Sequence, residues 1–413
     1  MKTMKKDLRN TIILCLALFK GGTDAQAAEP YLPTNTNPAL LYWREFAILP
    51  DFDSDQFQTL AEQTEIDAAF RRYTERFNDT FRRLGKTDRL TAPCNWGDDL
   101  DEGPELLLPY LSKARDVARV GRLRVKVHLA DNNESAAIDD LLSIHRLSSH
   151  VGSSPILINA LVHYAMDKIF AATIAENLGS FSQESLRRLK AGLLRTPEAK
   201  PLADSIDTER RFMVGWFRQR LTEILHEHGG DNAGAREATK NLFGYLFTIG
   251  EADDVWEAFE AANAKDVRGI IRLIDETNHE YDRLETVCRL PLAEAIQSSK
   301  AFDQESTASK NPIRREAFPA ISKAVVRAAG NQVVRAMVLT AINYRLIGEA
   351  AFREAADPVS GAPFKVSEFK HDEAVVGFIL ASELEDDRDK RHLFLLKPTP
   401  NLQLSGSNIG DPN

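Results

Sequence analysis

The sequence predicts a mainly α-helical protein with a small antiparallel β-sheet near its C-terminal end. Apolar residues recur three and four positions apart over most of the chain, which is the spacing of one helix face. Short polar turns separate these segments and predict antiparallel helix pairs of the helical-repeat or solenoid-like kind. Only 357–396 combines turn residues with strand-like stretches. At 43% apolar and 27% charged residues, the composition is typical of a folded globular chain.

The first expected helices cover 38–48 and 55–85. A longer amphipathic helix is expected over 104–130, with Pro104 at the first helical position, which tolerates proline because its N–H has no helical partner. The turn "DNNES" follows, and 136–152 then forms the antiparallel return helix. This is the first helix pair.

A second pair follows directly. Ser154 can cap a helix and Pro155 can begin it, which predicts a helix over 155–179 and, after a polar turn, another over 184–194. Two consecutive pairs with short turns are typical of a helical repeat. Tetratricopeptide proteins have such pairs, but the sequence carries only part of their signature.

The rest of the chain divides into helices, a linker and a sheet. Further helices are expected at 203–228, 234–262, 264–290 and 320–355. The stretch 298–312 is polar and poor in large apolar residues, which predicts a linker over 298–319 between a helical domain (28–297) and a C-terminal unit (320–397). Strands are expected within 364–369, 374–381 and 391–396, and a disordered tail at 398–413.

The N-terminus has the pattern of a signal peptide. A basic segment precedes the nine-residue apolar run 11–19, and the small-residue site Ala25-Gln26-Ala27 precedes Ala28. A membrane-spanning helix needs about twenty apolar residues, so the run is too short to be an anchor. We therefore expect cleavage after residues 1–27, export to the periplasm or the medium, and no transmembrane segment in the mature chain.

The charge of the chain argues against nucleic-acid binding. Segment 1–27 contains five basic and two acidic residues, so its removal changes the formal charge from -9 to -12. Affinity for a phosphate backbone depends on clustered lysine and arginine, and no such stripe is present. Cleavage also leaves two cysteines, Cys94 and Cys288. An exported chain can oxidise them to a disulfide, or both can remain buried thiols, and the sequence does not decide between these.

One stretch resembles a known group of proteins. "CNWGDDLDEGPELLLPYLSKARDVAR", with the helix pair after it, is similar to uncharacterised exported helical proteins of planctomycete-type bacteria. The tail resembles the C-terminal part of type II secretion pseudopilins through Asp357, Pro358, Ser360, Gly361, Pro363 and Phe364, then Val376, Gly377, Phe378, Ile379 and Leu380. The resemblance implies the fold and export, and it brings no catalytic residue. The Gly-Arg-Tyr-Pro turn of the planctomycete-type family is missing, as are the glycine-rich acidic end and the hydrophobic first helix of a pseudopilin.

The acidic loop 98–105 is the first candidate site. Asp99 and Asp101 alternate as in a calcium loop, but Gly103 comes one position early and no terminal glutamate follows at the required spacing. Acidic residues also stabilise the positive end of a helix dipole. We favour the start of a helix over a calcium site, with Trp96 as a packing anchor.

Histidine patterns give the other metal candidates. Glu-x-x-His, which diiron bundles use twice, occurs at 223–226, 276–279 and 368–371, but helical phasing turns the first two pairs away from the core. "HEHGGD" could bind a transition metal weakly through His226, His228 and Asp231, although a polar helix end is the favoured interpretation. His145 and His150 face different sides of their helix.

No catalytic or cofactor motif is present. The nucleotide-binding loops, the Gly-x-Ser-x-Gly nucleophile pattern and the His-Glu-x-x-His zinc pattern are absent, so no cofactor is expected. Ser367-x-x-Lys370 lies in a strand, where the helical presentation that this pair needs is missing. The sequence therefore favours an exported helical scaffold that binds a partner, most simply a protein, in the cell envelope. A metal-dependent or hydrolytic enzyme, with residues distant in sequence, is the alternative.

Overall fold

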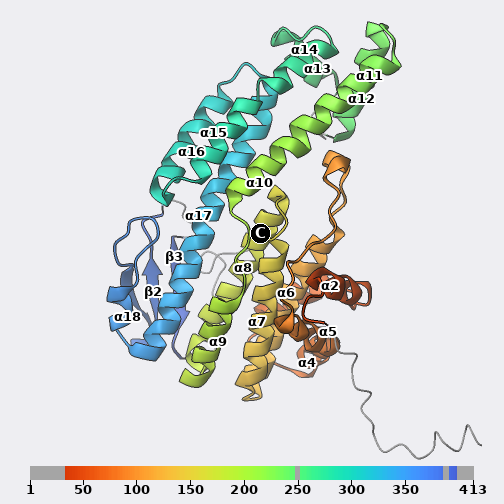
Figure 1. Cartoon of the computed structure of the whole chain (residues 1–413). Coiled ribbons are helices and arrows are strands. Elements are labelled where there is room, and N and C mark those ends of the chain that lie inside the picture. Colours follow the sequence, from red (N-terminus) through yellow and green to blue (C-terminus); the bar gives the residue numbers. More distant parts are fainter. Residues whose placement is uncertain (1–32, 247–251, 385–389, 398–413) are drawn as a thin grey trace, which may run out of the picture.

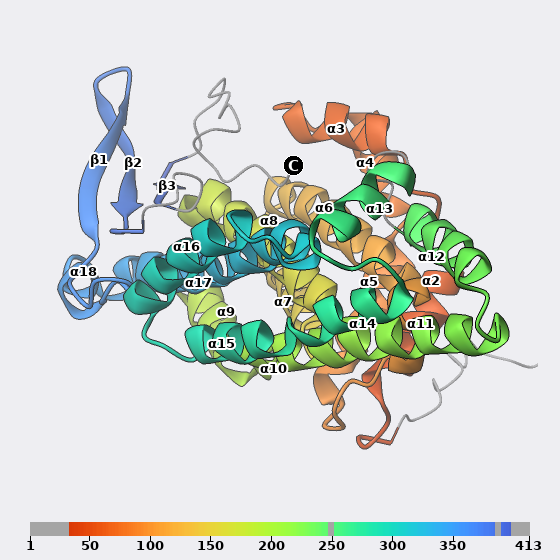
Figure 2. The same cartoon turned by 90° about the horizontal axis from the view of Figure 1, so that it is seen from above.

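The computed structural model describes residues 33–246, 252–384 and 390–397. The expected signal peptide (1–27) and C-terminal tail (398–413) lie outside these residues. The described chain is mainly helical, as predicted, and ends in a three-stranded antiparallel sheet. Figures 1 and 2 show the helices packed lengthwise, with the sheet at one end of the molecule.

The first half contains short helices followed by two long pairs. The short ones are α2 (Pro38–Ala47), α3 (Ser54–Glu62), α4 (Ala68–Glu75), α5 (Asn78–Leu84) and the 3₁₀ turns η1 (Gly85–Arg89) and η2 (Leu100–Glu105). The two predicted pairs are present as α6 (Pro109–Ala130) with α7 (Glu134–Val151), and α8 (Leu157–Asn177) with α9 (Gln183–Arg195), where η3 (Leu178–Ser180) joins the second pair.

The second half continues with shorter helices around one long one. The short helices are α10 (Leu202–Glu209), the π-helical segment η4 (Arg210–Gly215), α11 (Trp216–Glu227), α12 (Asn232–Leu246), α13 (Ala252–Ala261), α14 (Val267–Asp275), α15 (Asn278–Cys288) and α16 (Leu292–Thr307). The long helix α17 (Pro312–Ile347) is followed by α18 (Ala350–Glu354), β1 (Lys365–His371), β2 (Ala374–Ala381) and β3 (Arg391–Leu395).

Several predicted boundaries were wrong. The helix expected over 55–85 is divided into α3, α4 and α5, because Asp67 accepts from the Phe70 N–H and caps a new helix. The helix expected from Pro104 begins at Pro109 instead. Gly103 has φ +58°, which kinks the segment η2 and which a continuous α-helix cannot contain, and a side chain there would collide with the ring of Trp216.

The predicted linker 298–319 is not a linker. Its residues belong to α16 and α17, separated by a short turn at 308–311. Asn311 caps α17 by accepting from the N–H groups of Ile313 and Arg314, and Pro312 occupies the first helical position. The helices hold together because the rings of Phe302 and Phe318 pack 5.8 Å apart. The small polar residues that suggested a linker include buried ones, Ser299 and Ser306.

Helix α17 joins the two hydrophobic cores of the molecule. Its 36 residues extend for about 54 Å at 1.5 Å per residue. Phe318, Ile321 and Val325 pack in one core with α10–α16. Val333 and Met337 pack in the other core with α2–α9 and the sheet. Figure 1 shows α17 running between these two parts, so the described residues do not separate into a helical domain and an independent C-terminal unit.

The sheet has the order β1-β2-β3, and aromatic packing attaches it to α17. Tyr344 lies 4.6 Å from Phe352 and 4.9 Å from Phe378, measured between ring centroids. Asp372 and Glu373 both have positive φ, as the tight β1–β2 hairpin turn requires. Figure 2 shows this hairpin projecting from the helices.

A mostly buried acid lies where α10 meets the π-helical segment. Burial raises the pKa of Glu209 from its ordinary 4.5 to about 7, and the described residues provide it with no ion pair or hydrogen bond. Tyr281 lies close enough that Glu209 contributes, after burial, to raising the pKa of its phenol. An ionised carboxylate at this position therefore destabilises the fold.

We expect Glu209→Gln to stabilise the protein at pH 8 and to have little effect at pH 4. The folded-state pKa lies above the unfolded one, so the stability linked to the protonated acid is complete below about pH 4.5 and is lost as the pH rises through about 7. The gain at pH 8 is up to about 3 kcal/mol. Urea unfolding at both pH values measures it, with the exposed Glu257→Gln as control. Equal effects at both pH values would contradict the prediction.

Candidate functional site

The acidic loop 98–105 and the residues just before it, 94–97, form part of a largely buried hydrogen-bond network. The Asp98 carboxylate accepts from the hydroxyls of Tyr110 (2.9 Å) and Ser154 (2.8 Å). Trp96 stacks on Tyr110 with ring centroids 4.2 Å apart, and its indole N–H donates to the carbonyl of His150 over 2.8 Å. The loop therefore fastens the N-terminal helices to α6 and α7, and Trp96 is the predicted packing anchor.

The two proposed calcium ligands have local roles. Asp99 caps the 3₁₀ turn η2 by accepting from the Asp101 N–H over 3.0 Å, and both side chains are exposed. The loop does begin a helical turn, but the turn is this short 3₁₀ segment and not the long helix α6. The two cysteines are free thiols in the structure. Cys94 packs against the core of α2–α9 and Cys288 against that of α10–α16, so of the two alternatives the structure has the unbridged one.

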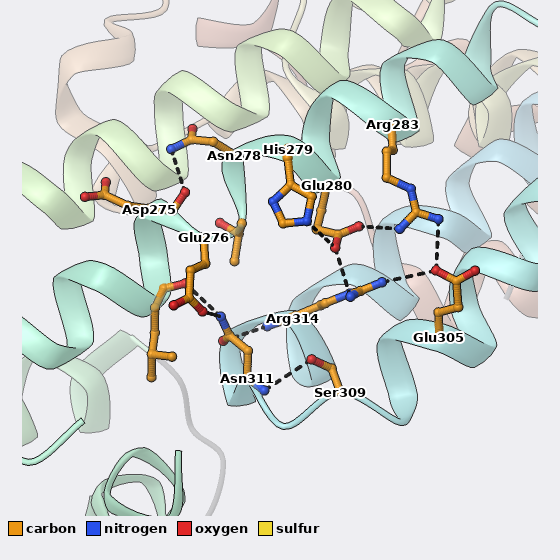
Figure 3. Close-up of polar contacts among 12 residues, drawn as sticks. Asp275, Glu276, Asn278, His279, Glu280, Arg283, Glu305, Ser309, Asn311 and Arg314 are labelled. Atoms are coloured by element: carbon orange, nitrogen blue, oxygen red, sulfur yellow. Dashed lines mark hydrogen bonds and ion pairs between the residues drawn. The ribbon is translucent and has the colours of Figure 1, made fainter. Parts of the chain in front are cut away.

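The Glu-x-x-His pair Glu276/His279, at the end of α14 and the start of α15, lies beside an ion-pair network at the surface (Figure 3). The His279 side chain is 66% exposed and contacts Glu280 over 2.9 Å, while Glu276 accepts from Asn311 at 3.5 Å. The buried acid is Glu280, which Arg283 (3.0 Å) and Arg314 (2.9 Å) neutralise. Glu276 and His279 are both exposed, as predicted, although the helix expected over 264–290 is divided into α14 and α15 between them. The ion pair of Glu280 with Arg314 fastens α15 to α17.

The other histidine candidates are also not assembled into one group. His228 Nδ1 and Asp231 Oδ2 both lie beside Gly234, but Asp231 caps α12 through the Ala233 N–H and His226 is exposed. Glu223 pairs with Arg220, and Glu368 with Lys370. Within the described ranges, the structure brings together no group of three or more His, Cys, Asp or Glu residues with the geometry of a metal site.

The cluster that sequence reasoning missed is buried between α7, α8 and α17. Its centre is the fully enclosed carboxylate of Asp167 on α8. Ser148 of α7 donates to Asp167 Oδ1 over 2.7 Å, and Asn331 of α17 donates to Oδ2 over 3.3 Å. His163 lies one turn before Asp167, with Nδ1 2.8 Å from the Ser148 hydroxyl. His145 of α7 lies 3.9 Å from Oδ1.

The ionised form of Asp167 is favoured in spite of its burial. Burial by itself would raise the pKa of this carboxyl. The two imidazoles, the Ser148 hydroxyl and Arg335 outweigh that effect, so the pKa lies below its usual value. Burial lowers the pKa of His145 to about 4, which leaves its ring neutral at pH 7. A neutral imidazole has one N–H donor and one bare acceptor nitrogen.

A cavity of about 50 Å³ lies beside this cluster, between α7, α8, α9 and α17. Three polar side chains line it, those of His145, Asp167 and Arg335. Its other walls are apolar: Phe170, Ala171, Leu193, Leu194, Val338 and Leu339. One of the lining residues, Leu194, is 69% exposed. At 10–15 Å³ for each water, the space holds roughly three or four waters or a small ligand group.

Two of the polar groups at this cavity are without protein partners. Neither ring nitrogen of His145 makes a hydrogen bond, although the side chain is only 4% exposed. Among the described residues, Arg335 also has no ion pair or hydrogen bond. An unpaired buried polar group costs about 1–3 kcal/mol, so the buried His145 ring indicates a site that a ligand or ordered water completes, and the partly exposed Arg335 lies at the same cavity.

A signal for this cluster was present in the sequence. Each of its three helices carries two polar residues three or four positions apart on a face that is otherwise apolar: His145 with Ser148, His163 with Asp167, and Asn331 with Arg335. Such spacing places both side chains on one side of a helix. Comparing the directions of His145 and His150 on their own helix did not reveal the cluster, because the residues that pack beside His145 lie on α8 and α17.

No protein-family model, curated protein or solved structure matches this chain. The resemblance to planctomycete-type proteins and to pseudopilins therefore stays a prediction from the sequence. In the part of the chain that the structure describes, no helix is long and apolar enough to cross a membrane. The chemistry of the cavity follows from its own contacts.

Proposed function

We propose that this protein is an exported, non-catalytic binding module that holds a group of its ligand or partner in the cavity between α7, α8, α9 and α17. The observation that carries the proposal is His145, a buried imidazole at the cavity with both ring nitrogens unpaired. Arg335 and Asp167 place a positive and a negative charge beside it. Apolar walls with a few convergent polar groups are the lining of a ligand site, and at about 50 Å³ this cavity takes one small group of a ligand.

The geometry supports binding better than hydrolysis. Ser148, His163 and Asp167 have the composition of a catalytic triad, but the Ser148 hydroxyl lies 2.7 Å from the carboxylate as well as 2.8 Å from His163 Nδ1, so the carboxylate competes with the histidine for the serine proton. The Ser148 side chain is completely buried and does not line the cavity. A substrate in the cavity therefore has no activated hydroxyl within reach.

Filling the cavity tests the binding function. We expect Ala171→Leu to place its added carbons in the cavity beside His145 and to abolish ligand retention. The change in the free energy of unfolding should stay below about 2 kcal/mol in either direction, because the added volume enters existing space. Native mass spectrometry of the purified chain after incubation with cell-envelope extract, compared with the variant, measures retention.

The experiment needs a control variant, and the compartment from which the protein is purified tests export. Ala308→Leu adds the same carbons at a helix end distant from the cavity lining and should retain the ligand. Retention by wild type and Ala171→Leu alike would refute the cavity as the binding site. The chain is purified from the periplasm or the medium, where export predicts an N-terminus near Ala28; recovery only of uncleaved protein in the cytoplasm would refute export.

A protein partner fits this proposal. The exposed Leu194, which lines the cavity, offers an apolar contact for a chain that inserts one group. The projecting β1–β2 hairpin is a second exposed surface, but two lysines and a bulge after Phe369 make its edge less suitable for pairing with another strand.

A further inference from the structure

We propose that the cavity recognises an α-carboxylate together with a hydrogen-bond donor on the adjacent nitrogen, the chemistry shared by the C-terminus of a protein chain and a free amino acid. This inference rests on the proposed binding function and specifies the ligand. It follows from three groups that line one cavity: Arg335, His145 and Asp167.

Arg335 supplies the positive charge for the carboxylate. Its guanidinium lies near enough to Asp167 and His145 to act on both electrostatically, yet it makes no ion pair or hydrogen bond with any described residue. A guanidinium presents parallel N–H groups that match the two oxygens of a carboxylate. An unpaired arginine at a cavity wall is therefore suited to an anionic group.

His145 complements both parts of the ligand. The neutral ring has one N–H, which can donate to a carboxylate oxygen, and one bare nitrogen, which can accept from the nitrogen of the ligand. Neither atom has a protein partner, and the ring is held in place by packing on Phe170 with centroids 5.0 Å apart. The site is therefore built before a ligand arrives.

Asp167 distinguishes this ligand from a simple anion. Its ionised carboxylate lines the same cavity and would repel a carboxylate that brings no donor of its own. Ser148 and Asn331 each donate to one of its oxygens, which leaves lone pairs for a further donor. An amide N–H or an ammonium on the carbon next to the carboxylate satisfies Asp167 and Arg335 at the same time.

The size of the cavity limits the side chain of the ligand. About 50 Å³ accommodates a carboxylate, its α-carbon and nitrogen, with little space remaining. The apolar walls formed by Leu193, Val338 and Leu339 suit a small apolar side chain. Alanine is therefore the residue that we use in the probes.

Four matched probes test the inference: N-acetyl-L-alanine as a chain terminus, L-alanine as a free amino acid, N-acetyl-L-alanine amide without the carboxylate, and propionate without the nitrogen. The imidazole NMR signals of His145 in the full mature chain report binding during each titration. We expect at least one of the first two probes to give saturable shifts, and the last two to bind at least tenfold more weakly. If N-acetyl-L-alanine binds more tightly than L-alanine, the natural ligand is the C-terminus of a chain. If L-alanine binds more tightly, the natural ligand is a free amino acid.

Variants on α17 provide the control. Arg335→Gln should weaken binding of the tighter probe at least tenfold, whereas Arg327→Gln, which changes an exposed arginine of the same helix, should leave it unchanged. Equal binding of the amide or of propionate would overturn the α-carboxylate inference while the binding function stands. If no probe binds, the inference is also overturned, and the Ala171→Leu comparison decides the proposed function separately.

Discussion

Asp167→Ala should lower the free energy of unfolding at pH 7 by about 3–5 kcal/mol, the largest effect that we expect from one polar substitution. The buried carboxylate accepts from Ser148 and Asn331. Its removal leaves the Asn331 amide without an acceptor in the interior and leaves Ser148 with its contacts to His163 alone. Hydrogen bonds to a charged group contribute about 1.5–3 kcal/mol each. Urea unfolding of the variant and the wild type measures the difference.

The pH dependence identifies the charge as the cause. The pKa of Asp167 is lower when folded than its ordinary 3.8, so the stability it provides is complete above about pH 4 and is lost as the pH falls through the folded value. The difference in the free energy of unfolding between the wild type and Asp167→Ala should therefore become smaller below pH 4. Asp139→Ala removes an exposed carboxylate from α7 and should cost less than about 1 kcal/mol. If this difference in the free energy of unfolding stayed constant with pH, lost packing and not the lost charge would be the cause of the destabilisation.

Local sequence signals predicted the helices better than the places where they end. The pairs α6/α7 and α8/α9 are present because their apolar periodicity is a local property of the chain. The predicted start of α8 was wrong, because Ser154 does not cap it and the helix begins at Leu157, two residues after Pro155. The predicted linker was wrong because its polar residues were interpreted without the helix α17 against which they pack. Ser299 and Ser306 are buried against α17, and serine is small enough to be buried where helices approach closely.

The candidate site was less predictable for a physical reason. The acids and histidines that stand out in the sequence, such as Asp101 and His226, are exposed because charged side chains prefer water. The residues at the cavity are single polar positions within apolar helices, and 190 positions separate His145 from Arg335. Only the packing of α7, α8 and α17 brings these residues together, and the spacing of residues within one helix does not predict a contact between helices.

Trp96→Ala should lower the free energy of unfolding by about 3–5 kcal/mol, the cost of truncating a buried aromatic residue. The Trp96 side chain is 5% exposed and stacks between Tyr110 (4.2 Å) and Tyr42 (5.5 Å), measured between ring centroids. The substitution also removes the hydrogen bond to the carbonyl of His150. Urea unfolding measures the loss, and near-ultraviolet circular dichroism follows the remaining aromatic packing.

A stability comparison also separates the structural role of the acidic loop from cation binding. The double variant Asp99→Ala, Asp101→Ala loses only the cap of a short 3₁₀ turn and should cost about 1 kcal/mol, far less than Trp96→Ala. A bound cation stabilises only the folded state, so it raises the melting temperature in proportion to its occupancy. If calcium raised the melting temperature of the wild type but not of the double variant, the exposed carboxylates would be ligands. We expect equal melting temperatures with calcium and with EDTA, because Asp98, the acid of this loop with buried partners, is already bound by Tyr110 and Ser154.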